Sequence, residues 1–412
     1  METIKKNKIE NIVFILLCIS IFAYGIAYPI MKLWMFCAVA GIFAIYFAFQ
    51  SKRIEMDVRI IALIIVMAMI YYHDVEYYIE GETFKVATPI IAFILGSLIV
   101  GNRKATANTR VKWAVLSITL GIFVQGVIDF VEKIAAGEAT EKVGYNLYGI
   151  QMARTALEAD LLPMAAMFPV GIIIWRNRKD IKILILTIIV ELFLLFLSLK
   201  CEGRYSISLM ALSTIVVMAV YFFNEWLNLN RSFKKWLMII ICVAIGSGLI
   251  GLVAFKLNLF GIYDIYENSY FSRDGGIIHN VRFSMMARGW YNLKLYPLGG
   301  WKNDWEGWFT STHDMWLEYG REFGMSVFLV LGLYLLLTIK DILILSFSRK
   351  SKGIEKYMLL AAFIAFNTFY FFEGYSLSHL RMPDMSGLAD GAIKAKCCAL
   401  LLPDMEGICL QR

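Results

Sequence analysis

Apolar runs long enough to cross a lipid bilayer are the feature that most constrains how this chain of 412 residues can fold. A helix that crosses the hydrocarbon core needs about 20 largely apolar residues, within a range of about 17–25. In lipid, only helices and closed barrels satisfy their own backbone polar groups. These runs are too long and too continuously apolar for barrel strands. The sequence therefore predicts an all-α polytopic membrane protein.

We predict about eleven transmembrane helices on this basis. Their ranges are Ile12–Ala27, Ile30–Phe49, Val58–Tyr72, Phe84–Val100, Trp113–Phe130, Leu161–Trp175, Ile181–Leu199, Tyr205–Phe223, Trp236–Phe255, Phe323–Ile339 and Tyr357–Phe372. The first of them is expected to stay uncleaved, because a second apolar span follows it almost at once.

The composition excludes several classes of protein. The chain is 59% hydrophobic and 18% charged, whereas soluble domains are about 45–50% apolar and about 25% charged. The net charge is +7, but the basic residues form short clusters between apolar spans, so nucleic acid is not an expected partner. The seven cysteines show neither a disulfide framework nor zinc-ligand spacing. One continuous membrane domain is the expectation.

Positive charge alternates between successive loops. Basic clusters occur at Lys5/Lys6/Lys8, Lys52/Arg53/Arg59, Arg103/Lys104/Arg110/Lys112, Arg176/Arg178/Lys179/Lys182, Arg231/Lys234/Lys235 and Arg349/Lys350/Lys352/Lys356. Because cytoplasmic loops are enriched in Lys and Arg, this alternation predicts a cytoplasmic N-terminus. It divides the chain into a bundle of about nine helices over 1–255, a large extracytoplasmic loop over 256–322, further transmembrane helices over 323–381 and an atypical tail over 382–412.

Three arginines lie on the predicted outer side. Arg204 begins a span, and Arg282 lies fifteen positions before Pro297 at the start of an amphipathic stretch that also contains Arg288. A guanidinium offers paired donors that suit phosphate oxygens, so each could bind an anionic group. Each could instead be a solvated charge, or in the case of Arg204 a side chain that reaches the headgroups.

The outer loop holds further polar and aromatic candidates. The stretch Met285–Leu295 is predicted to be an interfacial helix, ended by the turn Tyr296–Gly300. Three tryptophans follow, Trp301, Trp305 and Trp308. They fit an interfacial belt, and the alternative is that the three form an aromatic platform for sugar rings.

A short helix is predicted after the tryptophans. Thr310, Ser311 or Thr312 are its expected caps, and His313-Asp314 begins it. A histidine here can be a proton acceptor, which Glu318 could orient or assist, or it can be purely structural.

Taken together, these motifs resemble the O-antigen ligase and polymerase superfamily. The resemblance lies in Gly203-Arg204 at the head of a span, Arg282 before a Pro-Leu-Gly-Gly turn, and His313-Asp314-x-Trp-Leu-Glu running into a long apolar helix. It covers roughly Cys201 to Leu337. Family members usually have Ser-Arg and His-Asn at the first and last of these motifs. They also have about twelve spans, so this chain departs from the family in its tail.

The resemblance implies a GT-C-like glycosyltransferase that acts without metal or other cofactor on the outer face of the cytoplasmic membrane. The donor would be a glycan on undecaprenyl diphosphate, and the acceptor a hydroxyl of a glycan, lipid or protein. Flippase and chain-length regulator proteins would be its partners, together with the bilayer. Arg204 and Arg282 would stabilise the leaving diphosphate, and His313 would deprotonate the acceptor. Arg288, Asp314, Glu318 and Trp308 would bind substrate.

The sequence leaves polymerase, ligase and protein glycosylation open, although nothing ties the chain to a lipid A acceptor and a polymerase is preferred. A transporter or flippase of lipid-linked glycans is the competing class. Its best support is Glu191, which lies inside an apolar run. A sensor or structural membrane protein would need none of the Arg204, Arg282 and His313 set.

Overall fold

The computed structural model describes residues 2–27, 33–51, 57–77, 82–101, 104–135, 143–145, 151–153, 160–200, 205–226, 253, 256–259, 263, 281–299, 314–348, 351, 353–372, 389–390 and 392–393. Its helices are α1 (Glu2–Ala27), α2 (Leu33–Ser51), α3 (Val58–Tyr77), α4 (Glu82–Gly101), α5 (Lys104–Ala135), α7 (Leu162–Ala165), α8 (Phe168–Arg178), α9 (Ile181–Lys200), α10 (Tyr205–Glu225), α13 (Val281–Leu295), α14 (Met315–Phe323), α15 (Met325–Phe347) and α16 (Glu355–Phe372). The strands β1 (Val143–Tyr145) and β2 (Gln151–Ala153) form one antiparallel ladder.

The described residues are mainly helical apart from that ladder, which confirms the predicted all-α class, while the count of about eleven spans and the GT-C-like architecture stay predictions. Five described helices are long and apolar enough to cross a membrane, and Ala38–Phe49, Val58–Tyr72 and Pro89–Val100 are shorter apolar helices. Each lies on a span predicted from the sequence. The predicted span Trp236–Phe255 lies outside the described residues except for Val253. The protein is therefore a multi-pass membrane protein.

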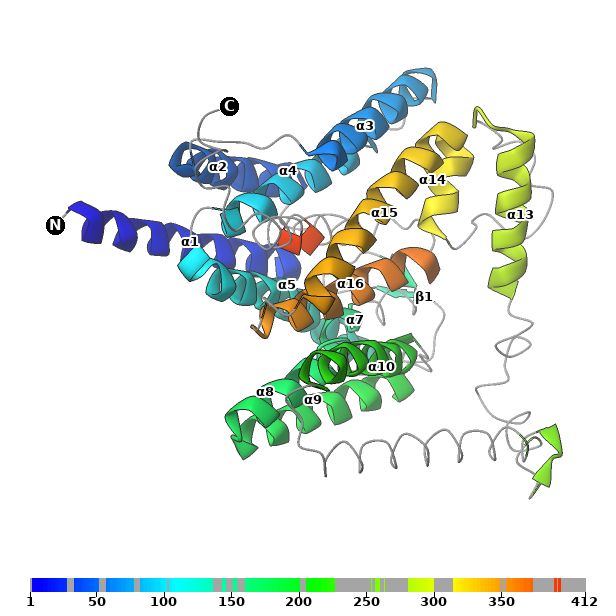
Figure 1. Cartoon of the computed structure of the whole chain (residues 1–412). Helices are drawn as coiled ribbons and strands as arrows, with labels where there is room; N and C mark the ends of the chain where they lie inside the picture. Colours follow the sequence, from blue (N-terminus) through cyan, green and yellow to red (C-terminus); the bar gives the residue numbers. More distant parts are fainter. Residues whose placement is uncertain are drawn as a thin grey trace.

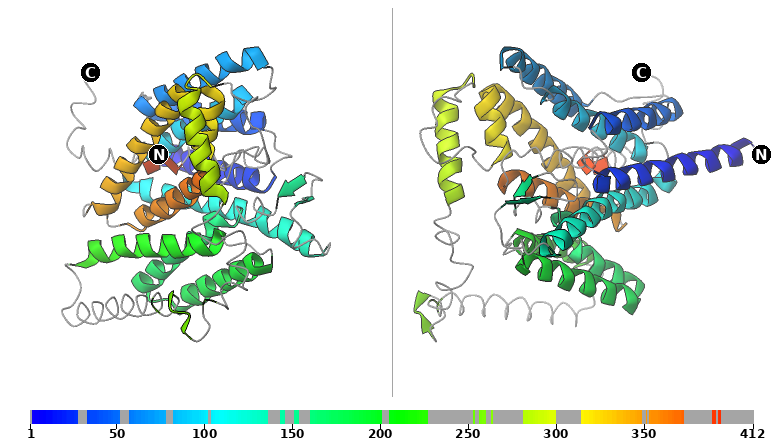
Figure 2. Two further views of the ribbon diagram at one scale, coloured as in Figure 1. Left: turned by 90° about the vertical axis from the view of Figure 1, so that its right-hand side faces the viewer. Right: turned by 180° about the vertical axis from the view of Figure 1, so that it is seen from behind.

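The long helices pack against one another at different inclinations, and α13 stands at one edge of the assembly, beside α14 and α15 (Figures 1 and 2). The closest crossing joins α1 and α5. A Cβ added to Gly25 would lie 2.7 Å from the carbonyl carbon of Gly121. Small residues at such a crossing let two helix backbones pack directly, which is how helices associate in membranes.

Polar contacts connect helix ends that the alternation of charge predicts to lie on the same side of the membrane. Arg110 Nη2 of α5 lies 2.6 Å from Glu10 Oε1 of α1. Asn224 Nδ2 of α10 donates to the carbonyl oxygen of Ser346 in α15 at 2.7 Å. Successive spans must reverse direction for these ends to meet, as a multi-pass topology requires.

Two predicted boundaries were wrong. The span Leu161–Trp175 is interrupted, because α7 ends at Ala165 and α8 begins at Phe168. Pro169 has no amide hydrogen to donate back along a helix, so the chain turns here instead of continuing. The span predicted to start at Phe323 starts at Met325, after a break at Gly324, and continues to Phe347.

Part of the predicted tail 382–412 lies in the centre of the bundle. Ala389, Asp390, Ala392 and Ile393 are all buried, and the three apolar ones belong to the main hydrophobic core (Figure 1, red). Short apolar segments can be held this way without spanning a membrane, because the surrounding helices cover them.

Candidate active site

The structure brings four of the seven predicted site residues onto two neighbouring helices. Asp314 and Glu318 lie at and within α14, and Arg282 and Arg288 lie on α13. The other three, His313, Arg204 and Trp308, lie outside the described residues. His313 directly precedes Asp314 in the sequence.

Asp314 is the N-cap of α14. Its backbone is extended (φ −139°, ψ 113°), and its Oδ1 accepts a hydrogen bond of 3.0 Å from the amide of Leu317. The predicted caps Thr310, Ser311 and Thr312 were therefore wrong, because the helix begins later in the chain than expected. Aspartate is a strong cap, since its side chain accepts a hydrogen bond from an otherwise unpaired amide. Its negative charge is also attracted to the positive end of the helix dipole.

The environment of Asp314 favours its neutral form. The side chain is buried, and desolvation raises its pKa to about 6, with a smaller contribution from the charge of Glu318. Hydrogen bonds from the amides of Leu317 and Trp316 act in the opposite direction. A carboxyl with such a pKa can accept or release a proton close to neutral pH.

Glu318 forms a buried ion pair within α14. Its Oε1 lies 2.6 Å from Arg321 Nη2, and both side chains are at least nine-tenths buried. Burial lowers the pKa of Arg321, and the charge of Glu318 opposes that effect. The sequence analysis gave Arg321 no role, although a Glu-x-x-Arg spacing on a short helix already places the two on one face.

The two arginine positions of α13 lie on different faces. Counting in steps of three and four, position 282 is in register with Met286, Gly289 and Leu293. Gly289 and Leu293 are buried, and Leu293 packs beside Gly320 of α14. Arg288 is exposed, as Tyr291 and Leu295 on its own face are. Arg288 is therefore a surface residue, whereas the side chain of Arg282 lies outside the described part of the structure.

The turn after α13 holds the two helices together. The structure confirms the predicted turn, in which the Gly299 amide donates to the carbonyl oxygen of Tyr296 at 3.0 Å. Gly299 and Gly324 have φ angles of 82° and 95°, which residues with a side chain rarely adopt. These glycines let the turn lie directly on the α14–α15 junction.

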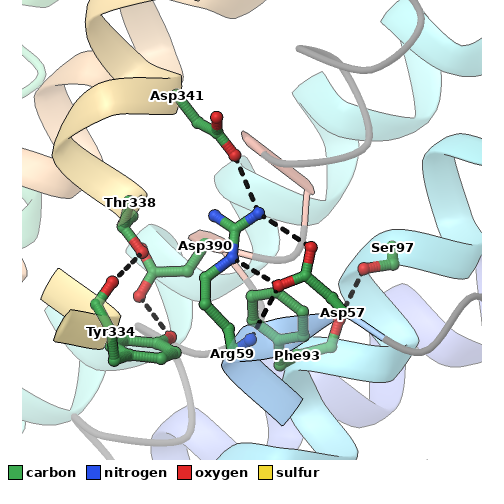
Figure 3. Close-up of polar contacts among 8 residues, drawn as sticks. All are labelled: Asp57, Arg59, Phe93, Ser97, Tyr334, Thr338, Asp341 and Asp390. Carbon is green, nitrogen blue, oxygen red and sulfur yellow. Dashed lines mark hydrogen bonds and ion pairs between the residues drawn. The ribbon is translucent and has the colours of Figure 1, made fainter. Parts of the chain in front are cut away.

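A second buried polar cluster was not anticipated from the sequence. Arg59 of α3 pairs with Asp57 and Asp341, while the hydroxyl of Tyr334 donates to Asp390 Oδ2 at 2.7 Å (Figure 3). The Arg59 guanidinium also lies 5.3 Å from the ring centroid of Phe93. Arg59 had been counted only as a loop charge, because its partner at position 341 is remote in the sequence.

Among the described residues, no group of three or more His, Cys, Asp or Glu is placed to hold a metal ion.

Comparison with known proteins identifies no family for this chain. No family model, curated protein or solved structure matches the chain.

Proposed function

We propose that this membrane protein transfers a glycan from undecaprenyl diphosphate to an acceptor hydroxyl on the outer face of the cytoplasmic membrane. One observation carries the proposal. Asp314, Glu318 and the position of Arg282 lie on two contacting helices at one end of a multi-pass bundle, next to His313 in the chain. Separated motifs of the extracytoplasmic loop thus belong to one local unit, as an active site requires.

The chemistry needs cations at the leaving group and a base at the acceptor. Cleavage of the sugar–diphosphate bond develops negative charge, which Arg204 and Arg282 would stabilise without a metal. His313 would take the proton from the acceptor hydroxyl. Asp314, adjacent to His313 and itself able to ionise near neutral pH, would tune that proton transfer.

The exposed side chains of α13 support a site at the membrane surface. Aromatic and basic side chains are exposed on α13, among them Trp290, Tyr291 and Arg288. Such a face suits the boundary between lipid and water, where the diphosphate of a lipid-linked glycan would lie. The GT-C-like architecture and the cytoplasmic N-terminus belong to the same proposal.

A transporter of lipid-linked glycans is the second candidate. Glu191 lies within the apolar helix α9 and is only 5% exposed. Its Oε2 has no hydrogen-bond partner in the part of the chain that the structure describes. Buried carboxylates inside spans often serve ion or substrate translocation.

Incubation of the purified protein with an undecaprenyl-diphosphate-linked oligosaccharide in the presence of EDTA separates these functions. A ladder of longer lipid-linked chains is expected for the preferred polymerase activity. Transfer only after a lipid or protein acceptor is added would identify a ligase or a protein glycosyltransferase. Intact donor under all conditions would contradict the proposal, and movement of that donor across proteoliposome membranes would support the transporter.

A further inference from the structure

A buried ion pair connects α3 to the part of α15 that is remote from α14. Arg59 Nη2 lies 2.7 Å from Asp341 Oδ2, and Arg59 Nε lies 2.8 Å from Asp57 Oδ1 (Figure 3). The Arg59 side chain is 4% exposed. Charge-assisted hydrogen bonds have a narrow geometry, and loss of the Asp341 carboxylate would leave the Arg59 guanidinium paired with Asp57, on the α3 side, and no longer tied to α15. The pair therefore resists any sliding of α15 along α3.

The same helix α3 contacts α14 further along its length, near its middle. Val66 and Ile70 share an apolar cluster with Tyr319 and Phe323 of α14 and with Val327 of α15. Asp341 lies sixteen positions after Met325, so the two residues are about 24 Å apart along the axis of α15. Helices α3 and α15 thus form an antiparallel pair that connects the ion pair to the candidate active site.

Helices α14 and α15 are joined directly, without an intervening loop. Only Gly324 separates the two helices, and the amide of Met325 donates to the carbonyl oxygen of Pro297 at 2.7 Å. A shift of α15 along its axis would therefore displace α14 and the turn together.

We propose that Arg59 and Asp341 are positioning residues, which hold Asp314 and Glu318 in place by setting the register of α15 against α3. The structural part of this inference stands alone, and its consequence for glycan transfer rests on the proposed function.

The chain offers a matched control in the pair Glu10–Arg110. Its charges lie 2.6 Å apart with side chains 3% and 4% exposed, and the Arg110 guanidinium lies 5.6 Å from the ring centroid of Phe14. The pair joins α1 to α5 and not to α15. Neutralising it should cost similar stability without moving α14.

Hydrogen–deuterium exchange of the full chain in nanodiscs tests the proposal. Asp341→Asn should accelerate exchange of the amides 317–323 by at least about tenfold, the factor that corresponds to about 1.4 kcal/mol of local stability. Glu10→Gln should leave these amides unchanged and accelerate exchange in α1 and α5. Asp341→Glu, which keeps the charge, should restore most of the protection. Should Asp341→Asn not fold, Arg59→Lys serves in the same measurement, because it keeps the charge and loses the fork geometry.

Unchanged exchange in α14, or equal acceleration by Glu10→Gln, would overturn the inference. If the wild-type protein transfers glycan, Asp341→Asn should lower kcat/KM at least about tenfold, since Asp314 and Glu318, the groups proposed to tune proton transfer and to bind substrate, are displaced. Absence of transfer by the wild-type protein would count against the proposed function and would leave the exchange result to decide the inference.

Discussion

The amide of Met325 donates a 2.7 Å hydrogen bond to the carbonyl oxygen of Pro297, which fastens the turn after α13 to the first residue of α15. Two glycines make this contact possible. An added Cβ would lie 2.9 Å from Pro297 O at Gly324 and 2.6 Å from Glu322 O at Gly299. The turn, α14 and the start of α15 are thereby one packed unit.

Gly324→Ala should destabilise the protein by about 2 kcal/mol or more, because a side chain would meet backbone atoms and the φ of 95° is strained for alanine. Thermal unfolding in detergent would measure the effect. Gly332→Ala is the control, since nothing lies within 4 Å of its added Cβ. There the change should be neutral or stabilising by up to about 1 kcal/mol. Equal effects at both positions would mean that the turn does not pack on the junction.

Stability should depend on Asp314 between about pH 4 and pH 6. Its folded pKa of about 6 exceeds the ordinary value of 3.8, so the folded state binds the proton more tightly than the unfolded state does. Its contribution is therefore present at low pH and is lost as the pH rises through about 6, to a total of up to about 3 kcal/mol. Unfolding midpoints at pH 5 and pH 7 should differ less for Asp314→Asn, which keeps the cap, than for the wild type. An identical pH response in both proteins would show that Asp314 is ionised throughout.

The Glu318–Arg321 pair allows structure and chemistry to be separated. Arg321→Met alone should cost about 3–5 kcal/mol, because it leaves a buried carboxylate without its cation. The double variant Glu318→Leu with Arg321→Met should recover most of that stability, since well-packed apolar residues can replace a buried pair. If Glu318 binds substrate, glycan transfer should stay low in the stable double variant. Recovery of both stability and transfer would assign Glu318 a structural role only.

Alanine at Arg204, Arg282 or His313 should abolish transfer, at least about a hundredfold for each, because each is proposed to act on the reacting groups. Membrane insertion and thermal stability should stay near those of the wild type. Arg288→Ala is the matched control, because Arg288 lies on the exposed face of α13. It should change transfer less than Arg282→Ala. Normal transfer in the His313 variant would remove that residue from the mechanism.

Much of the architecture could be predicted from the sequence, because only helices and closed barrels satisfy their own backbone polar groups inside a bilayer. Length and continuous hydropathy located the described spans, and the aromatic–basic pattern predicted the helix that became α13. The Pro297–Gly299 turn was likewise predictable, since proline and glycine restrict the backbone locally. The sequence did not decide which of several adjacent capping residues begins the helix, and Asp314 is the cap in place of a nearby threonine.

The sequence alone determined the fold class, the multi-pass topology and the order of the Arg282, Asp314 and Glu318 motifs, because these depend on periodicity and on neighbouring residues. Only the tertiary structure decided that Arg288 is exposed, that Glu318 pairs with Arg321, and that Arg59 meets Asp341. The partners of a buried charge depend on how helices pack, and residues 59 and 341 come together only when the bundle forms. The burial of Asp390 has the same cause, since the helices of the bundle enclose the segment that carries it.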